Sequence, residues 1–369
     1  MSASARLPFV DLHPADDAMA IRAAIERVVA SGWYILGPEV EQFETEFASA
    51  CGARFAVGVG SGTDAIALAL RALDIGPGDE VIVPALTASF TAMAVIACGA
   101  RPVCVDVDRN TLTIDPGACA QAITSRTRAV VPVHLYGQPA EMNGVRRVAD
   151  QHALAIVEDC CQAHLATEHG VPVGTRADAA AFSFYPTKNL GALGDGGAVV
   201  TGNAKLAERI RRLRNGGQSD RYQHLEPGVN SRLDELQAAV LRARLPLLPR
   251  WTARRRELAA VYRRELPSSV HTIEERDPGH VYHLFPVRVP ERDLLRAHLA
   301  AAGIETLIHY PTSLTEQPAF AAYESPPCPV AAEASRTLLS LPLHPRLGDA
   351  DVTTVAREVG VFLKGTQPA

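Results

Sequence analysis

RFAVGVGSGTDAIALALRAL, residues 54–73, passes from a hydrophobic β-like run through a glycine-rich break into an alanine- and leucine-rich helical run. The alternation continues, with strands expected over residues 80–83, 102–107, 128–133 and 154–157, and helices over residues 88–98 and 141–152. Continuous hydrophobic strands that alternate with helices are typical of a mostly parallel sheet covered on both faces. The sequence therefore predicts an α/β fold.

The flanking segments extend this pattern and then change it. Two amphipathic helices are expected upstream over residues 16–31 and 38–50, and Pro38 suits a first helical position. Downstream we expect strands over 179–184 and 198–201, then helices over 231–245 and 252–266. From about residue 270, the segments 281–289, 291–302 and 304–309 form a compact α+β pattern before a final helix over 349–363. We therefore predict a large domain, residues 1–245 with an N-terminal helical arm, and a smaller α+β domain, residues 246–369.

Composition excludes several classes of protein. The 369 residues carry a net charge of -5, so no overall positive field draws the chain to nucleic acid or to an anionic membrane. The N-terminal residues lack the hydrophobic stretch of a secretory signal, and the uncharged run 81–100 is interrupted by Pro84 and hydroxyl side chains. The seven cysteines show no zinc-binding or disulfide spacing. We expect a cytoplasmic protein with no metal site.

Three segments carry the chemistry. Gly60-Ser61-Gly62-Thr63 stands between a strand and a helix, where free N–H groups and hydroxyls can bind a phosphate. Asp159 follows a buried strand, where α/β sheets place their ligands. Lys188 is a lone lysine in FSFYPTKNLG, residues 182–191, after another strand. Each segment alone has a simpler explanation as a turn, a cap or a solvated loop, but together they supply what a pyridoxal phosphate site needs.

The sequence resembles the DegT/DnrJ/EryC1/StrS family of pyridoxal-phosphate-dependent sugar aminotransferases over nearly its whole length. The resemblance rests on the lysine loop and on the segments SGWYILGPEV (31–40), HLYGQ (134–138), EDCCQAH (158–164), GDGGA (194–198) and GVNSRLDELQAA (228–239). It implies a fold-type I aminotransferase. It also implies pyridoxal 5'-phosphate as cofactor, with pyridoxamine phosphate as its intermediate form.

The resemblance also implies roles for individual residues. Lys188 would form the Schiff base and carry protons, Asp159 would pair with the pyridine nitrogen, and Gln162 would lie near the ring hydroxyl. The phosphate would be held by Gly62, Thr63 and Ser183, and by Asn230 of a neighbouring subunit in a homodimer with shared sites. Ala88 stands where the family usually places a planar residue over the ring, with Phe90 two positions on as a substitute. Tyr185, Tyr222 and His309 lie in segments that line the substrate cleft in relatives.

The implied reaction moves an amino group from glutamate or glutamine to a ketosugar linked to a nucleotide diphosphate, as in amino sugar biosynthesis. The segments 36–38 and 134–138 favour relatives that act at the 3-position. A keto-cyclitol acceptor and a non-catalytic regulatory relative remain open alternatives. Sugar dehydratase relatives carry histidine in place of the lysine, so Lys188 argues against that reaction.

Overall fold

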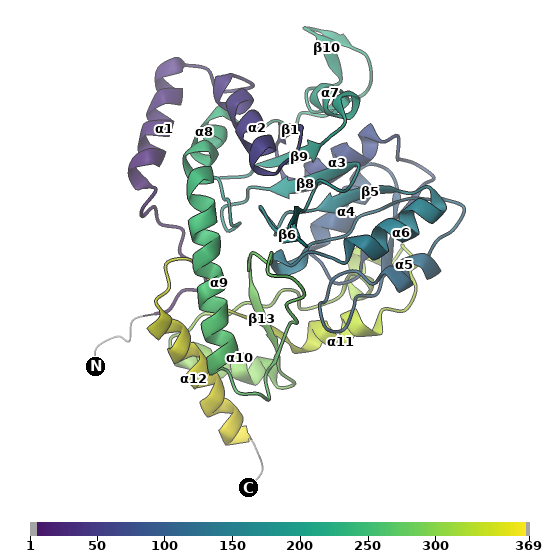
Figure 1. The fold of residues 1–369 in the computed structure, drawn as a ribbon. Coiled ribbons are helices and arrows are strands. Elements are labelled where there is room, and N and C mark those ends of the chain that lie inside the picture. The colour runs from purple at the N-terminus through teal and green to yellow at the C-terminus, as the bar shows by residue number, and fades with distance from the viewer. Residues whose placement is uncertain (1–5, 367–369) are drawn as a thin grey trace.

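A seven-stranded sheet forms the centre of the large part of the protein in the computed structural model, which describes residues 6–366 (Figure 1). The strand order is β1-β9-β8-β5-β4-β2-β3, and only β9 runs antiparallel to its neighbours. The strands are β1 (Phe55–Val59), β2 (Glu80–Pro84), β3 (Arg101–Val105), β4 (Thr127–Val130), β5 (Ala155–Asp159), β8 (Ala179–Ser183) and β9 (Gly197–Thr201). This arrangement confirms the predicted mostly parallel sheet.

Helices cover both faces of this sheet because successive strand residues point to opposite sides. In β5, Val157 packs into one hydrophobic cluster and Ile156 into another. The first face is covered by α3 (Gly62–Ala72), α4 (Ser89–Ala97) and α7 (Ala204–Leu213). The second is covered by α2 (Pro38–Ala50), α5 (Pro116–Gln121), α6 (Met142–His152) and α8 (Glu235–Arg244), and α1 (Ala18–Ser31) packs on α8. The hydrophobic run 81–100 is divided between β2 and α4.

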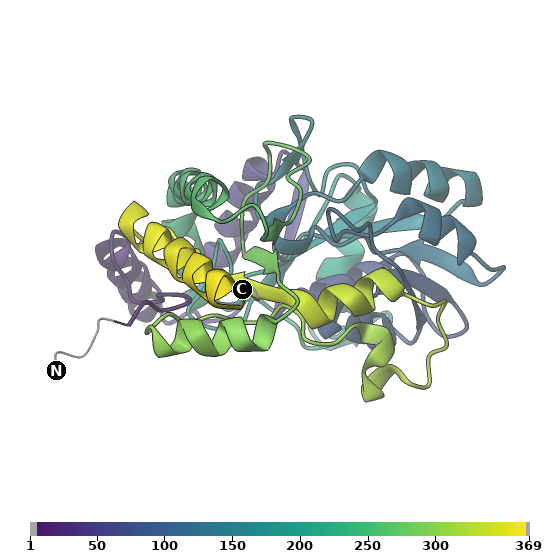
Figure 2. The ribbon, with the colours of Figure 1, turned by 90° about the horizontal axis from the view of Figure 1, so that it is seen from below.

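The C-terminal part has its own hydrophobic core around a three-stranded antiparallel sheet. Figure 2 views the molecule from the side on which the green and yellow helices of this part lie. The strands are β12 (His271–Thr272), β13 (Phe285–Arg288) and β14 (Leu338–Leu341), and the helices are α9 (Leu248–Glu265), α10 (Arg292–Ala301), α11 (Pro329–Thr337) and α12 (Asp349–Thr366). The segment 304–309 forms isolated bridges, Ile304 with Leu7 and Leu307 with Ser340. The N-terminal segment therefore pairs with the C-terminal part. A short 3₁₀ turn, η2 (Leu245–Leu247), separates α8 from α9, and the division of the chain at residue 245 stays a prediction.

One local prediction needs correction, and one element was missed. The helix expected to begin at Ser231 begins at Glu235, because Asn230 pairs with Asn215 and Asp234 pairs with Ile35 in isolated bridges. A hairpin of β10 (Gln218–Asp220) and β11 (Gln223–His224) also projects from the large part, and the sequence did not predict it (Figure 1).

The remaining short elements are β6 (Thr167–Glu168), β7 (Val171–Pro172), η1 (Leu135–Gly137), η3 (Leu314–Glu316) and η4 (Pro318–Phe320). Among residues 6–366, no helix combines the length and the apolar composition needed to cross a membrane.

Candidate active site

A cavity of about 580 Å³ opens where the parallel strands end, and its walls include Thr87 and Val133, each three residues beyond the end of β2 or β4, and the last residues of β5 and β8. Carboxyl ends of parallel strands are where open α/β sheets bind their ligands. Nine of the eleven predicted site residues line this cavity: Gly62, Thr63, Ala88, Asp159, Gln162, Ser183, Tyr185, Lys188 and His309. Residues 120 or more positions apart in the sequence therefore meet at one site.

The other two predicted residues do not line the cavity. Tyr222 lies between β10 and β11 with 79% of its surface exposed. Asn230 is exposed and its backbone pairs with Asn215. Neither residue lines the cavity of its own chain. The role of Asn230 at a neighbouring subunit and that of Tyr222 in the substrate cleft stay predictions.

The first turn of α3 forms one end of the cavity. The Ser61 side chain caps the helix by accepting the Asp64 N–H at 3.1 Å. The N–H groups of Gly62 and Thr63 precede the first possible intrahelical bond, and they lie at the positive end of the helix dipole. A Cβ on Gly62 would stand 2.7 Å from the Ser183 Cβ and 2.8 Å from the Cys161 Sγ. Glycine at this position therefore lets the helix start approach the end of β8 closely enough to make one anion-binding cup.

Asp159 is the last residue of β5, and hydrogen bonds hold its carboxylate in place. Only 5% of its surface is exposed. Thr91 Oγ1 donates to Oδ2 at 2.8 Å, and the Cys161 N–H donates to Oδ1 at 3.1 Å. Two donors on separate oxygens fix the orientation of the carboxylate. Such a group can pair with a cationic ring nitrogen in the cavity.

Gln162 is held between two tyrosines of the site. Its Oε1 accepts the Tyr136 N–H at 2.7 Å, and its Nε2 donates to the Tyr310 hydroxyl at 2.9 Å. The amide therefore has a defined orientation before any ligand binds. The Tyr310 hydroxyl also lines the cavity, and burial raises the pKa of that hydroxyl.

Lys188 is half-buried in the loop after β8, and its backbone N–H donates to the Tyr185 carbonyl at 2.8 Å. Burial lowers the pKa of its amine below the usual value near 10.5, while the negative charge of Asp159 acts in the opposite direction. A lowered pKa increases the fraction of neutral, nucleophilic amine at a given pH. Lys188 is one of three lysines in the chain, with Lys205 and Lys364, and the other two are exposed.

Several residues of the cavity escaped the sequence analysis. They are Thr91 and His283, together with Cys161, whose thiol pKa is raised well above its usual value by burial. The stretch HVYH, residues 280–283, offered a signal, because histidines beside a hydrophobic strand often serve a buried site. Phe90 also lines the cavity and is 63% exposed, so its side chain stands at the rim rather than in the interior.

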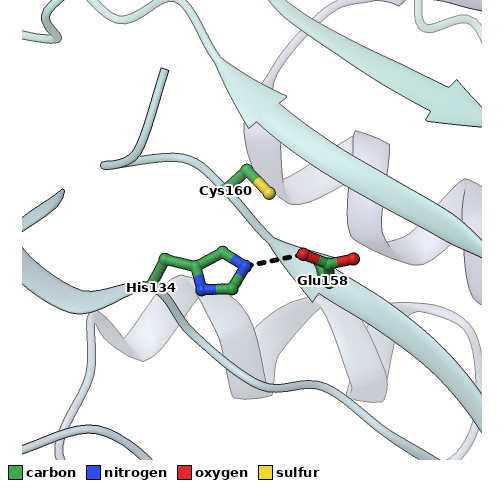
Figure 3. A group of neighbouring side chains, drawn as sticks. All are labelled: His134, Glu158 and Cys160. Carbon is green, nitrogen blue, oxygen red and sulfur yellow. Dashed lines mark hydrogen bonds and ion pairs between the residues drawn. The ribbon is translucent and has the colours of Figure 1, made fainter. Parts of the chain in front are cut away.

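His134, Glu158 and Cys160 form a second group, at the end of β5 (Figure 3). These residue types can bind a metal ion, but here the protons occupy the atoms that would have to bind it. His134 Nδ1 accepts the Ala140 N–H at 2.9 Å, so the ring proton lies on Nε2 and is donated to Glu158 at 2.8 Å. Burial raises the thiol pKa of Cys160, which keeps the thiol protonated. Metal binding needs a free imidazole lone pair and a thiolate. The group is a structural hydrogen-bonded pair with a thiol beside it.

Comparison with known proteins gives one consistent result. The model of the DegT/DnrJ/EryC1/StrS aminotransferase family matches residues 15–360. The dTDP-3-amino-3,4,6-trideoxy-alpha-D-glucose transaminase of Streptomyces venezuelae is 52% identical over 93% of this chain and 92% of its own. The dTDP-3-amino-3,6-dideoxy-alpha-D-galactopyranose transaminase of Aneurinibacillus thermoaerophilus is 47% identical over 96% of this chain and 99% of its own.

Solved structures agree with the sequence comparison. The crystal structure of S. venezuelae DesV superposes with a TM-score of 0.94 at 49% identity, covering 99% of this chain and 100% of DesV. The structure of NtdA from Bacillus subtilis, which holds pyridoxamine phosphate, superposes with a TM-score of 0.91 at 32% identity, covering 99% of this chain and 86% of NtdA.

Proposed function

Because the chain belongs to the DegT/DnrJ/EryC1/StrS aminotransferase family, we propose that this pyridoxal-phosphate-dependent aminotransferase acts on the 3-ketone of a nucleotide-linked sugar. The observation that carries the proposal is the 52% identity, over 93% of the chain, to a transaminase named for a dTDP-3-amino sugar. The second relative, at 47% identity, is also named for a dTDP-3-amino sugar.

The residues of the cavity fit the cofactor. The close approach of Gly62 to Ser183 leaves a cup for a phosphate between the start of α3 and the end of β8, with Thr63 beside it. Asp159 would hold the pyridine nitrogen in its protonated form, Gln162 would face the ring hydroxyl, and Lys188 would bind the aldehyde. When bound, the cofactor supplies an electron sink for the carbon that gains or loses the amino group.

Lys188 is the proposed proton carrier. With its pKa lowered by burial, the amine can take a proton from the donor carbon and return it to the acceptor carbon. The donor in this proposal is glutamate or glutamine, as in the sequence-based prediction. Asp159, fixed by Thr91 and the Cys161 N–H, would keep the ring nitrogen protonated throughout.

The diphosphate of the acceptor needs cationic or hydrogen-bonding partners beyond this cavity. Among the described residues that line it, Lys188 is the single lysine or arginine. We therefore propose a homodimer in which Asn230 and Tyr222 of one subunit complete the site of the other. Both residues are exposed, and a row of exposed hydrophobic side chains, Trp33, Tyr34 and Ile35, precedes α2 and offers surface for such a contact.

The compartment in this proposal is the cytoplasm. All seven cysteines are free thiols, which fits a reducing environment.

The test is a product analysis with a panel of ketones. The panel contains a dTDP-linked 3-ketohexose, a dTDP-linked 4-ketohexose, the free 3-ketohexose and a free keto-cyclitol, each with glutamate and with glutamine. We expect the dTDP-linked 3-ketohexose to react fastest, because the remote nucleotide adds binding energy that orients the ketone at Lys188. Faster amination of the free keto-cyclitol would contradict the sugar assignment. Absence of turnover with every ketone, with cofactor bound, would favour the regulatory alternative.

A further inference from the structure

A second cavity, of about 340 Å³, adjoins the lysine loop. Its wall shares Thr187 and Lys188 with the active-site cavity, and all its other residues are different. They come from the N-terminal segment 10–17, from the rest of the lysine loop, from α8 and α9, and from the segment 344–346. The cavity therefore lies where the large part of the protein meets the C-terminal part.

Arg255 of α9 is a buried cation in the wall of this cavity. The residue is 6% exposed, and its Nη1 donates to the carbonyls of Tyr282, His283 and Leu343 at 3.2, 3.3 and 2.8 Å. It forms no ion pair among residues 6–366, and burial alone lowers its pKa to about 10. A buried charge is costly unless opposite charge or further hydrogen bonds compensate it. The carbonyls engage only one of the three nitrogens.

The other two nitrogens of this guanidinium, Nε and Nη2, form one free edge. Neither has a hydrogen-bond partner among residues 6–366, and both keep accessible surface. Nε and Nη2 of an arginine present parallel N–H bonds, whose spacing matches two oxygens of a carboxylate or of a tetrahedral oxyanion. The unpaired edge of Arg255 therefore has the geometry of an oxyanion-binding group.

The acidic side chains of the same wall do not supply the missing partner. Each lies within ion-pair distance of an arginine other than Arg255, in the pairs Asp11–Arg346, Asp16–Arg250 and Asp17–Arg244. His344 also lines the cavity, and burial lowers its pKa to about 4, so this ring is neutral near pH 7. Of the arginines in the described wall, Arg255 is thus the one without an acidic partner.

We propose that this cavity binds a small oxyanion, held by the Nε–Nη2 edge of Arg255. The ligand class is a carboxylate or a tetrahedral anion such as sulfate or phosphate, because both present two oxygens to a guanidinium edge. A bound oxyanion compensates the buried charge of Arg255. The inference does not depend on which ketone the enzyme aminates.

The measurement uses the enzyme saturated with pyridoxal phosphate, so that the phosphate cup at the start of α3 is already filled. Isothermal titration calorimetry with sulfate and with acetate is run at constant ionic strength, with chloride as the balancing salt. We expect one site per chain for at least one of the two oxyanions. Tighter binding of acetate would identify a carboxylate ligand, and tighter binding of sulfate a tetrahedral one.

Two substitutions on α9 test the assignment to Arg255. Arg255→Lys keeps the positive charge but lacks the two-pronged edge, and we expect oxyanion affinity to fall about 10–100-fold, as for the loss of a hydrogen bond between charged groups. Arg254→Gln is the matched control, because Arg254 is paired with Glu257 and Asp349 and does not line the cavity. It should bind oxyanions like the wild type. Thermal unfolding of each variant establishes that it is folded.

Crystals of the wild-type enzyme soaked in selenate locate the site directly, because selenate is a tetrahedral oxyanion with an anomalous signal. We expect selenate at the Nε–Nη2 edge of Arg255, and this result stands even if Arg255→Lys does not fold. Water alone at that edge, no heat from either oxyanion, or wild-type affinity in folded Arg255→Lys would overturn the inference. Failure of the ketone panel with these results intact would reject only the proposed acceptor.

Discussion

Replacement of Gly197 by alanine tests how the anion-binding cup is built. Gly197 begins β9 and pairs with Val59 on one side and Ser183 on the other. A Cβ at this position would stand 2.3 Å from the Ser61 carbonyl oxygen and 2.8 Å from the Gly62 nitrogen. Both atoms belong to the peptide that begins α3, so the new methyl group meets backbone rather than a side chain that can rotate away.

The size of the effect follows from these distances. Real Cβ contacts essentially never fall below 3.0 Å, so the Ser61–Gly62 peptide must move by at least 0.7 Å. A shift of that size is large enough to spoil the alignment of N–H groups that would bind a phosphate. Overpacking of this kind costs about 1–3 kcal/mol of stability. We expect cofactor affinity to fall about 100-fold, equal to ~2.8 kcal/mol.

The assay is titration of apoprotein with pyridoxal phosphate, followed by absorbance, together with thermal unfolding of the apoprotein. Gly202→Ala is the matched control, because a Cβ at Gly202 meets nothing within 4 Å. It should bind cofactor and unfold like the wild type. A Gly197→Ala protein with wild-type affinity and wild-type unfolding temperature would refute the assignment of this helix start as the phosphate cup.

Further outcomes test the remaining parts of the site. Lys188→Ala should abolish turnover while circular dichroism shows the native fold, and near-normal turnover would contradict its role. Asp159→Asn should retain cofactor yet lower kcat by about 10²–10³-fold, measured at saturating substrates, because the ring nitrogen loses its anionic partner; an unchanged kcat would count against the pairing. Mixing inactive Lys188→Ala with inactive Asn230→Ala under subunit exchange should restore part of the activity, since one site of each mixed dimer is intact; no recovery would reject the shared site. Acidification from about pH 6.5 should lower the unfolding temperature, because buried His164 and His280 have folded pKa values of about 3 and the unfolded chain binds the protons. His280→Asn should make the unfolding temperature fall less steeply with pH. An unchanged dependence on pH would contradict the role of His280.

The parts of the site that the sequence predicted lie at the ends of strongly patterned elements. β5 and β8 are continuous hydrophobic runs, so their ends, and with them Asp159 and Ser183, could be placed from the sequence. Periodicity has no comparable signal for His283, which precedes a four-residue strand in the other part of the chain and meets Asn189 across 94 positions. The start of α8 was misplaced for a related reason. The predicted helix began at Ser231, but bridges from residues 230 and 234 to residues 215 and 35 hold this segment extended.

The setting of Lys188 also links reactivity to stability. Burial disfavours the charged form of Lys188 and lowers its pKa, and it does the same to two histidines that feel the charge of this lysine. The pKa of His164 is held to about 3 and that of His309 to about 4, in each case by burial first and by the charge of Lys188 second. Each neutral ring is a group that the unfolded chain protonates more readily than the folded chain below about pH 6.5. The burial that lowers the pKa of Lys188 therefore also makes the fold less stable at acid pH. A substitution that exposes this region should raise the pKa of Lys188 and also change the stability of the fold in acid.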